Sequence, residues 1–152
     1  MRKRTIARVL AVALGAALAL GALSGCQSPA TGATDQQQAN RTYMTKVNQA
    51  VEELNTRLGE FDEAVAQESV VNMRNKANSA FEAIDALAAI DTPDAMKDLQ
   101  TNYVDGCNKL KDALNSYIDL YTEISSATEE APFDFSAYDG RVKEIQDAYN
   151  EG

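Results

Sequence analysis

Apolar residues recur at intervals of three and four along most of this chain, which is the spacing of one face of an α-helix. The first run comprises Met44, Val47, Val51, Leu54, Leu58, Phe61 and Val65. It predicts one long helix over about residues 40–67, because the stretch holds no Pro and its single Gly lies off the apolar stripe. No segment shows the strict alternation of a half-buried strand. The spacing therefore favours an all-α fold.

Three further runs keep the same period. The second covers about residues 70–91, and Ser69 is placed to cap its helix. One helix from 40 to 91 would be unusually long, so a turn near residue 68 is favoured over a kink. The third covers about 93–127, with Thr92 as the predicted cap and Pro93 at the first helical position. The last covers about 136–150. The later stripes are Val70, Met73, Ala77, Phe81, Ile84 and Leu87; Met96, Leu99, Tyr103, Cys107, Leu110, Leu114, Tyr117, Tyr121 and Ile124; and Tyr138, Val142, Ile145 and Tyr149.

Helices with one-sided apolar faces must bury those faces on each other. We therefore predict an antiparallel bundle of three long helices, with a short C-terminal helix that covers an open groove or one end. The bundle domain spans residues 41–150. A domain of about 110 residues can bury enough surface to be stable without disulfides or a structural metal.

The N-terminal segment has the layout of a secretion signal. Arg2, Lys3 and Arg4 precede an uncharged, mostly apolar run from Val9 to Leu23, and its 15 residues fall short of the roughly 20 that span a bilayer core. The run ends in Leu23-Ser24-Gly25-Cys26, which resembles the lipobox of bacterial lipoproteins. The resemblance implies that residues 1–25 are removed as a signal peptide and that Cys26 carries diacylglycerol. Two acyl chains suffice for stable membrane anchoring, whereas one does not.

Residues 26–40 are polar and poor in large apolar side chains, so they are predicted to form a flexible tether. With its lipobox, tether and helices, the chain resembles the small helical lipoproteins of bacterial cell envelopes. That resemblance implies a lipid-anchored protein on the extracytoplasmic side of the cell membrane. It implies no ligand.

Charge and residue content exclude several function classes. Residues 1–25 hold four basic residues and no acid, so residues 26–152 carry 10 Lys and Arg against 23 Asp and Glu, a net charge of −13. This charge repels nucleic acid and anionic lipid headgroups. The chain has no His, which removes the commonest general base and metal ligand. No catalytic or nucleotide-binding motif is present, so we expect no enzymatic activity, cofactor or metal.

Two sets of residues are candidates for contact with another molecule. Phe133 and Phe135 lie beside Pro132 in an acidic loop, where they could anchor a partner or plug the end of the bundle. Tyr103, Gly106 and Tyr117 could line a ligand pocket on the third helix. For the tyrosines the alternative is the edge of the core, and for Gly106 it is close helix packing. Cys107 is expected to be a small buried residue, with a redox or dimer-forming thiol as the alternative.

The sequence favours a membrane-anchored, non-enzymatic interaction or structural module that meets an unidentified envelope protein. The alternative is a lipoprotein whose helical bundle binds a small ligand between its helices. Self-association is also possible, because the heptad-like spacing of the first helix is compatible with a coiled coil.

Overall fold

Helices account for most of the chain in the computed structural model, which describes residues 34–152. The α-helices are α2 (Asp35–Ala66), α3 (Val70–Ala88), α4 (Lys97–Ser126) and α5 (Tyr138–Glu151), and the short 3₁₀ turns η1 (Asp94–Met96) and η2 (Phe135–Ala137) precede the last two. The predicted all-α fold of three long helices and a short C-terminal one is confirmed. The predicted signal peptide, Cys26 and the first part of the tether lie outside the described residues.

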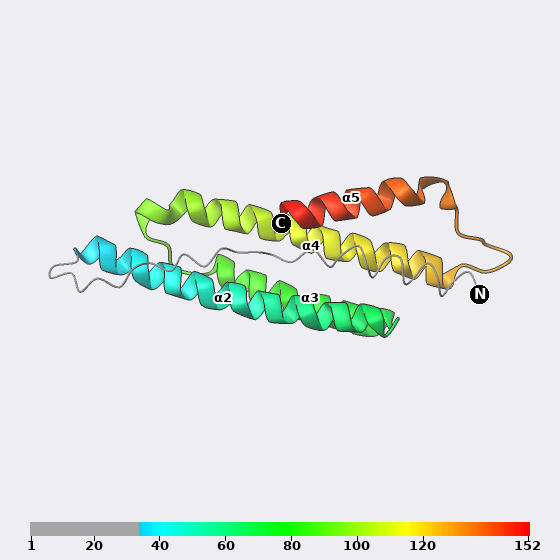
Figure 1. Ribbon diagram of the computed structural model, residues 1–152, viewed down its shortest axis with the longest axis horizontal. Helices are drawn as coiled ribbons and strands as arrows, with labels where there is room; N and C mark the ends of the chain where they lie inside the picture. Colours follow the sequence, from blue (N-terminus) through cyan, green and yellow to red (C-terminus); the bar gives the residue numbers. More distant parts are fainter. Residues whose placement is uncertain (1–33) are drawn as a thin grey trace.

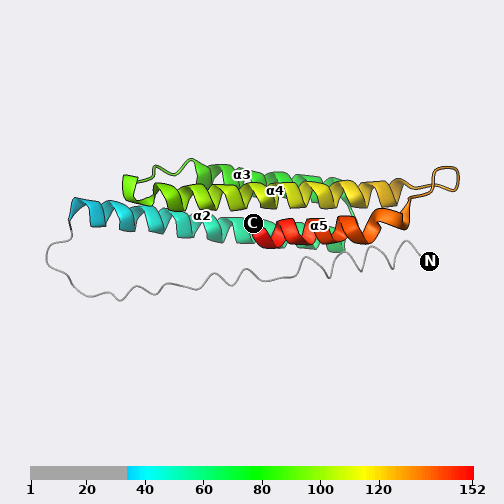
Figure 2. The same cartoon turned by 90° about the horizontal axis from the view of Figure 1, so that it is seen from above.

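Successive helices run antiparallel (Figures 1 and 2). α2 and α3 form one hairpin, α4 lies along α3, and α5 folds back along α4 until Gly152 lies against Gly106. We call the end of the bundle at which α2 begins the proximal end, and the opposite end, which carries the loop between α4 and α5, the distal end. α5 therefore covers the distal half of α4 and leaves its proximal half as part of a three-helix arrangement.

α2 begins earlier than its apolar stripe indicated. A capping box closes its first turn: the Gln37 amide donates to Thr34 Oγ1 at 3.3 Å, and the Thr34 amide donates to Gln37 Oε1 at 3.1 Å. Asp35 adds a negative charge at the positive end of the helix dipole. The prediction of a tether up to residue 40 is thus wrong for residues 35–40, which are helical.

The turn between α2 and α3 is confirmed. Glu68 has a φ of 55°, in the left-handed region that side chains rarely occupy and that reverses the chain direction after a helix. Ser69 then caps α3, accepting a hydrogen bond from the Asn72 amide at 3.3 Å. The two helices are therefore separate.

The predicted start of the third helix is wrong in detail. Thr92 caps nothing, because its hydroxyl donates backwards to the Ile90 carbonyl oxygen at 2.9 Å. Pro93 precedes η1 in an extended conformation, and the Met96 amide donates to the Pro93 carbonyl oxygen at 2.8 Å. The fixed φ of proline thus starts a short 3₁₀ turn, and the α-helix begins only at Lys97.

α4 is the central helix and is buried over a wider arc than its predicted stripe. It packs against α2 through the edge-to-face contact of Tyr117 with Phe61, whose ring centroids are 5.9 Å apart, and it also lies against α3 and α5. A helix with three neighbours buries more than one stripe. The additional buried residues of α4 are Gln100, Ala113, Ile118 and Leu120.

Candidate functional site

Three aromatic residues form a cluster at the distal end, which we call the aromatic tip: Phe133, Phe135 and Tyr138. The ring of Phe133 lies edge-on to the other two rings, with its centroid 4.8 Å from that of Phe135 and 6.4 Å from that of Tyr138. The ring centroids of Phe135 and Tyr138 are 6.0 Å apart. Phe133 and Tyr138 also pack against the core. Phe135 remains 53% exposed, and Val71 at the start of α3 is the other large apolar side chain left exposed in residues 34–152. One aromatic ring is thus held in water by two that are anchored in the bundle.

The loop that carries the aromatic tip is tied down at both ends. The Thr128 amide donates to the Ala131 carbonyl oxygen at 3.0 Å, and the Ala131 amide donates to Thr128 Oγ1 at 3.1 Å. Asp134 caps η2 by accepting from the Ser136 amide at 2.8 Å and from its hydroxyl at 3.0 Å. These hydrogen bonds lower the pKa of Asp134. The tip is therefore built on a fixed turn that ends in a carboxylate.

The surroundings of the aromatic tip are acidic. Glu129, Glu130, Asp134 and Asp139 all lie between Thr128 and Gly140, a stretch with no Lys or Arg. The nearest basic residue along the chain, Arg141, donates two hydrogen bonds from its guanidinium to the Glu123 carboxylate oxygens, at 2.6 and 2.9 Å. Its charge is thereby neutralised, and the tip is an apolar surface in a negative field.

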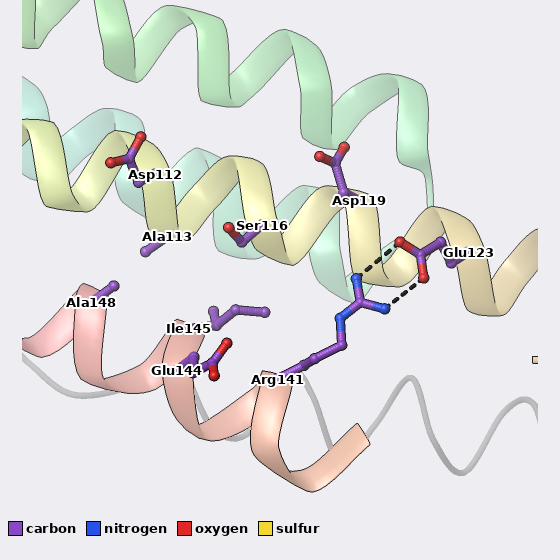
Figure 3. Close-up of a pocket in the computed structure, with 9 residues that line it drawn as sticks. All are labelled: Asp112, Ala113, Ser116, Asp119, Glu123, Arg141, Glu144, Ile145 and Ala148. Carbon is purple, nitrogen blue, oxygen red and sulfur yellow. Dashed lines mark hydrogen bonds and ion pairs between the residues drawn. The ribbon is translucent and has the colours of Figure 1, made fainter. Parts of the chain in front are cut away.

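A groove with a volume of about 410 Å³ separates α4 from α5 (Figure 3). Small and aliphatic side chains hollow it out, acidic side chains surround it, and the Arg141–Glu123 pair crosses from one helix to the other beside it. The lining residues are Asp112, Ala113, Ser116, Asp119, Glu123, Arg141, Glu144, Ile145 and Ala148. Its position was not predicted, because no stripe in the sequence reports where two small residues on facing helices meet.

The structure does not bring the predicted pocket residues together. Tyr103 and Tyr117 are 14 positions apart on α4, about 21 Å along the helix axis, and neither lines the groove. Gly106 is a close-packing site, since a Cβ atom there would lie 3.1 Å from the Gly152 carbonyl oxygen. Tyr103 is half-buried in the proximal half, and Tyr117 is buried against Phe61. The geometry favours the core interpretation of these residues.

A buried hydrogen-bond network joins three helices in the proximal half. The Tyr43 hydroxyl of α2 donates to Gln100 Oε1 of α4 at 2.6 Å. Gln100 Nε2 donates to the Leu87 carbonyl oxygen at the end of α3 at 2.9 Å. The sequence held one signal for this residue: Gln100 lies four positions after Met96 and three before Tyr103, so it occupies an apolar position of the stripe.

The distal half contains buried hydroxyl groups of a different kind. Within the part of the chain that the structure describes, the hydroxyls of Tyr117 and Tyr138 are buried and have no hydrogen-bond partner. Burial strongly raises the pKa of Tyr117, and the nearby hydroxyls of Tyr121 and Tyr138 and the Asp62 carboxylate add to the rise. Burial also raises the pKa of the Asp62 carboxyl.

Cys107 is buried in the core, at 7% exposure. Burial raises the pKa of its thiol, although Lys111 acts in the opposite direction. Because the thiolate is the reactive form, this environment opposes redox or nucleophilic chemistry. The position supports the interpretation of Cys107 as a packing residue.

No protein family model, characterised protein or solved structure matches this chain. Among the described residues, no group of His, Cys, Asp and Glu is arranged to hold a metal ion. None of the helices from Asp35 onward combines the length and apolar character needed to cross a membrane.

Proposed function

We propose that this protein is a lipid-anchored, non-enzymatic interaction module on the extracytoplasmic face of the bacterial cell membrane. The lipobox-like Leu23-Ser24-Gly25-Cys26 supports the anchor. The helical bundle supplies a rigid support for a contact surface, and the aromatic tip with Phe133 and Phe135 is that surface. Its partner is a protein of the cell envelope.

The exposure of Phe135 carries this proposal. A phenylalanine that is 53% exposed, on a capped turn and in contact with two other rings, has less conformational freedom to lose when a partner covers it than a free side chain. Rigid aromatic anchors of this kind dominate the binding energy of protein interfaces. The tip lies at the end of the bundle away from Thr34, where the polar N-terminal segment joins α2 (Figure 1). An anchor at Cys26 would thus be joined to the bundle at the end opposite the tip.

Site-specific photocrosslinking in intact cells tests this function. A photoreactive phenylalanine analogue replaces Phe135 in one strain and the exposed Asp98, near the proximal end, in a control strain. We expect one discrete crosslinked protein from position 135, and none from position 98. Replacing Cys26 with Ala in the same strain should abolish the crosslink if anchoring places the tip. Equal patterns from both positions would contradict the proposal.

Alanine substitution separates contact from plugging. Phe135→Ala should remove the partner and leave the thermal unfolding of the purified protein nearly unchanged, because the side chain is half in water already. Phe133→Ala should weaken both partner binding and thermal stability, because the Phe133 ring packs on the core. A large loss of stability from Phe135→Ala would mean that the loop plugs the bundle instead.

The groove between α4 and α5 gives the small-ligand alternative one supporting observation. Its volume of about 410 Å³ lies in the range of small-molecule sites. Such sites are mostly apolar, however, whereas four carboxylate residues line this one, so the alternative ranks second. Native mass spectrometry of protein from membranes, with and without the groove-filling variant Ser116→Phe, checks it. A small molecule lost in the variant would favour this alternative.

A further inference from the structure

We infer that the aromatic tip recognises a cationic protein segment that carries one exposed apolar side chain. The inference rests on the proposed interaction function and names the chemistry of the partner. Two properties of the tip carry it: a small aromatic surface held in one geometry, and the exposed acids Glu129, Glu130, Asp134 and Asp139 in the same stretch of chain, which has no Lys or Arg.

The apolar part of the surface fits a single side chain. Phe135 and Phe133 meet edge to face at 4.8 Å, and Tyr138 supports both rings from α5. Of the three side chains, that of Phe135 is exposed, whereas those of Phe133 and Tyr138 are half-buried. A surface of this size offers one aliphatic or aromatic side chain a place to pack, and it is too small for an extensive apolar interface.

The charged part of the surface selects a basic partner. Ion pairs engage eight of the ten Lys and Arg residues in the range 34–152. The other two, Arg41 and Lys46, lie in the first half of α2, far from the tip in sequence and in space (Figure 2). The acids from Glu129 to Asp139 therefore face the solvent without basic neighbours in their own stretch. A cationic segment would meet complementary charge around the apolar anchor.

The same charge argues against the other occupants. A second copy would bring one acidic tip against another, and like charges across an interface oppose association. An anionic membrane surface or a nucleic acid would be repelled for the same reason. A neutral protein segment would gain from the rings alone, and an acidic one would be repelled by the acids of the tip.

Three fluorescein-labelled peptides of equal length test the inference by fluorescence anisotropy with the full-length protein, purified in detergent. The first alternates Lys with Gly and Ser around one central Leu. The second has Ser in place of Leu, and the third has Glu in place of Lys. We expect the first to bind most tightly, the second to bind about tenfold more weakly, and the third not to bind. Raising the salt concentration should weaken the binding of the first peptide.

Variants of the protein assign the binding to the tip. Phe135→Ala should weaken the binding of the first peptide about tenfold. The double variant Glu129→Gln with Glu130→Gln should also weaken this binding and should make it less dependent on the salt concentration. The charge-matched control is Asp98→Asn with Asp105→Asn, which removes two exposed acids from the proximal half of α4 and should leave binding unchanged. Equal loss in both double variants would reduce the effect to overall net charge and overturn the inference.

Other outcomes separate this inference from the proposed function. If position 135 crosslinks one protein in cells and the crosslinked segment is acidic or lacks basic residues, the interaction function stands and the inference fails. If the three peptides bind equally, the inference fails whatever the cells show. A dimer that Phe135→Ala dissociates in sedimentation velocity would make a second copy the occupant. Absence of any crosslink from position 135 would remove the proposed function itself.

Discussion

The proximal and distal halves of this bundle solve the same packing problem differently. In the proximal half, α2, α3 and α4 enclose the Tyr43–Gln100 network, whose buried groups bond to each other and to the end of α3; only Asn40 Oδ1, near the start of α2, is buried there without a partner. In the distal half, α5 adds a fourth helix, two tyrosine hydroxyls are buried unpaired in residues 34–152, and an aromatic ring stays in water. The buried tyrosine hydroxyl of the proximal network is thus paired, whereas those of Tyr117 and Tyr138 are unpaired in the described half that carries the candidate contact.

The difference follows from helix length. α4 has 30 residues and α5 has 14, so α5 is about 24 Å shorter. α5 starts at the distal end, and Gly152 after it lies beside Gly106 of α4. Because Gly106 has no side chain, Gly152 can approach the backbone of α4. The interior of the distal half is therefore shared by four helices, and that of the proximal half by three.

The largest effect is expected from the centre of the four-helix half. Leu114→Ala should lower the free energy of unfolding by about 2–5 kcal/mol, because the side chain is fully buried and its removal leaves a cavity. The matched control Leu99→Ala, at a half-buried position in the proximal half, should cost about 1 kcal/mol. Urea denaturation of both variants checks this. Equal losses would mean that Leu99 is packed as tightly in solution as Leu114.

A loss of intermediate size is expected from the proximal network. Tyr43→Phe removes the donor to Gln100 Oε1 and leaves that buried oxygen unpaired, which should lower the free energy of unfolding by about 1–3 kcal/mol. The second variant Tyr43→Phe with Gln100→Leu removes both partners and should recover part of the loss. A stable Tyr43→Phe variant would show that the network contributes nothing.

The same substitution should have the opposite outcome in the distal half. Tyr117→Phe removes a buried hydroxyl that has no hydrogen-bond partner in the described part of the chain, and it keeps the ring against Phe61. We therefore expect no loss, or a gain of up to about 1 kcal/mol. Thermal and urea unfolding beside Tyr43→Phe check the contrast. A loss equal to that of Tyr43→Phe would show that the hydroxyl is paired in solution.

The sequence predicted the helices because each buries a stripe, and the period of three and four positions reports such a stripe directly. The stripe from Met44 to Val65 is buried or half-buried throughout. Helix ends were less predictable. Residues 35–40 carry no apolar stripe, and only the pair Thr34 and Gln37 marked the start of α2. Thr92 and Pro93 predicted that the third helix starts at Pro93, but the short turn η1 comes first and α4 starts at Lys97.

The candidate site was predictable only in part. Phe133 and Phe135 stood out because two aromatics in an acidic loop are unusual, and the structure brings them together with Tyr138. Tyr103, Gly106 and Tyr117 were grouped because they share one helix, yet a pocket needs residues from facing helices. The neighbour of Gly106 depends on where α5 ends, and that of Tyr117 depends on how α2 lies against α4; no local pattern in the sequence encodes either.

The smallest effect concerns Asp62, an acid of the distal half whose pKa is raised by burial. A raised pKa means that folding favours the protonated form, so its contribution to stability is full below the ordinary value of 3.8 and is lost as the pH rises through the folded-state pKa. Asp62→Asn should therefore become increasingly more stable than the wild type as the pH rises from the ordinary value of 3.8 through the raised folded-state pKa, with a constant difference above that. Urea denaturation across this range measures the difference.

The control for Asp62 has the opposite sign. Arg141 lowers the pKa of Glu123 through their hydrogen bonds, so the stability from that pair is present at neutral pH and is lost as the pH falls through the folded-state pKa. Glu123→Gln should thus be less stable than the wild type at neutral pH and should approach it in acid. If the Asp62 variant becomes more stable than the wild type as the pH rises and the Glu123 variant becomes less stable, the free-energy cost of desolvating a carboxylate lies at Asp62. Parallel curves would instead mean that its carboxylate is as well hydrated as the acids around the aromatic tip.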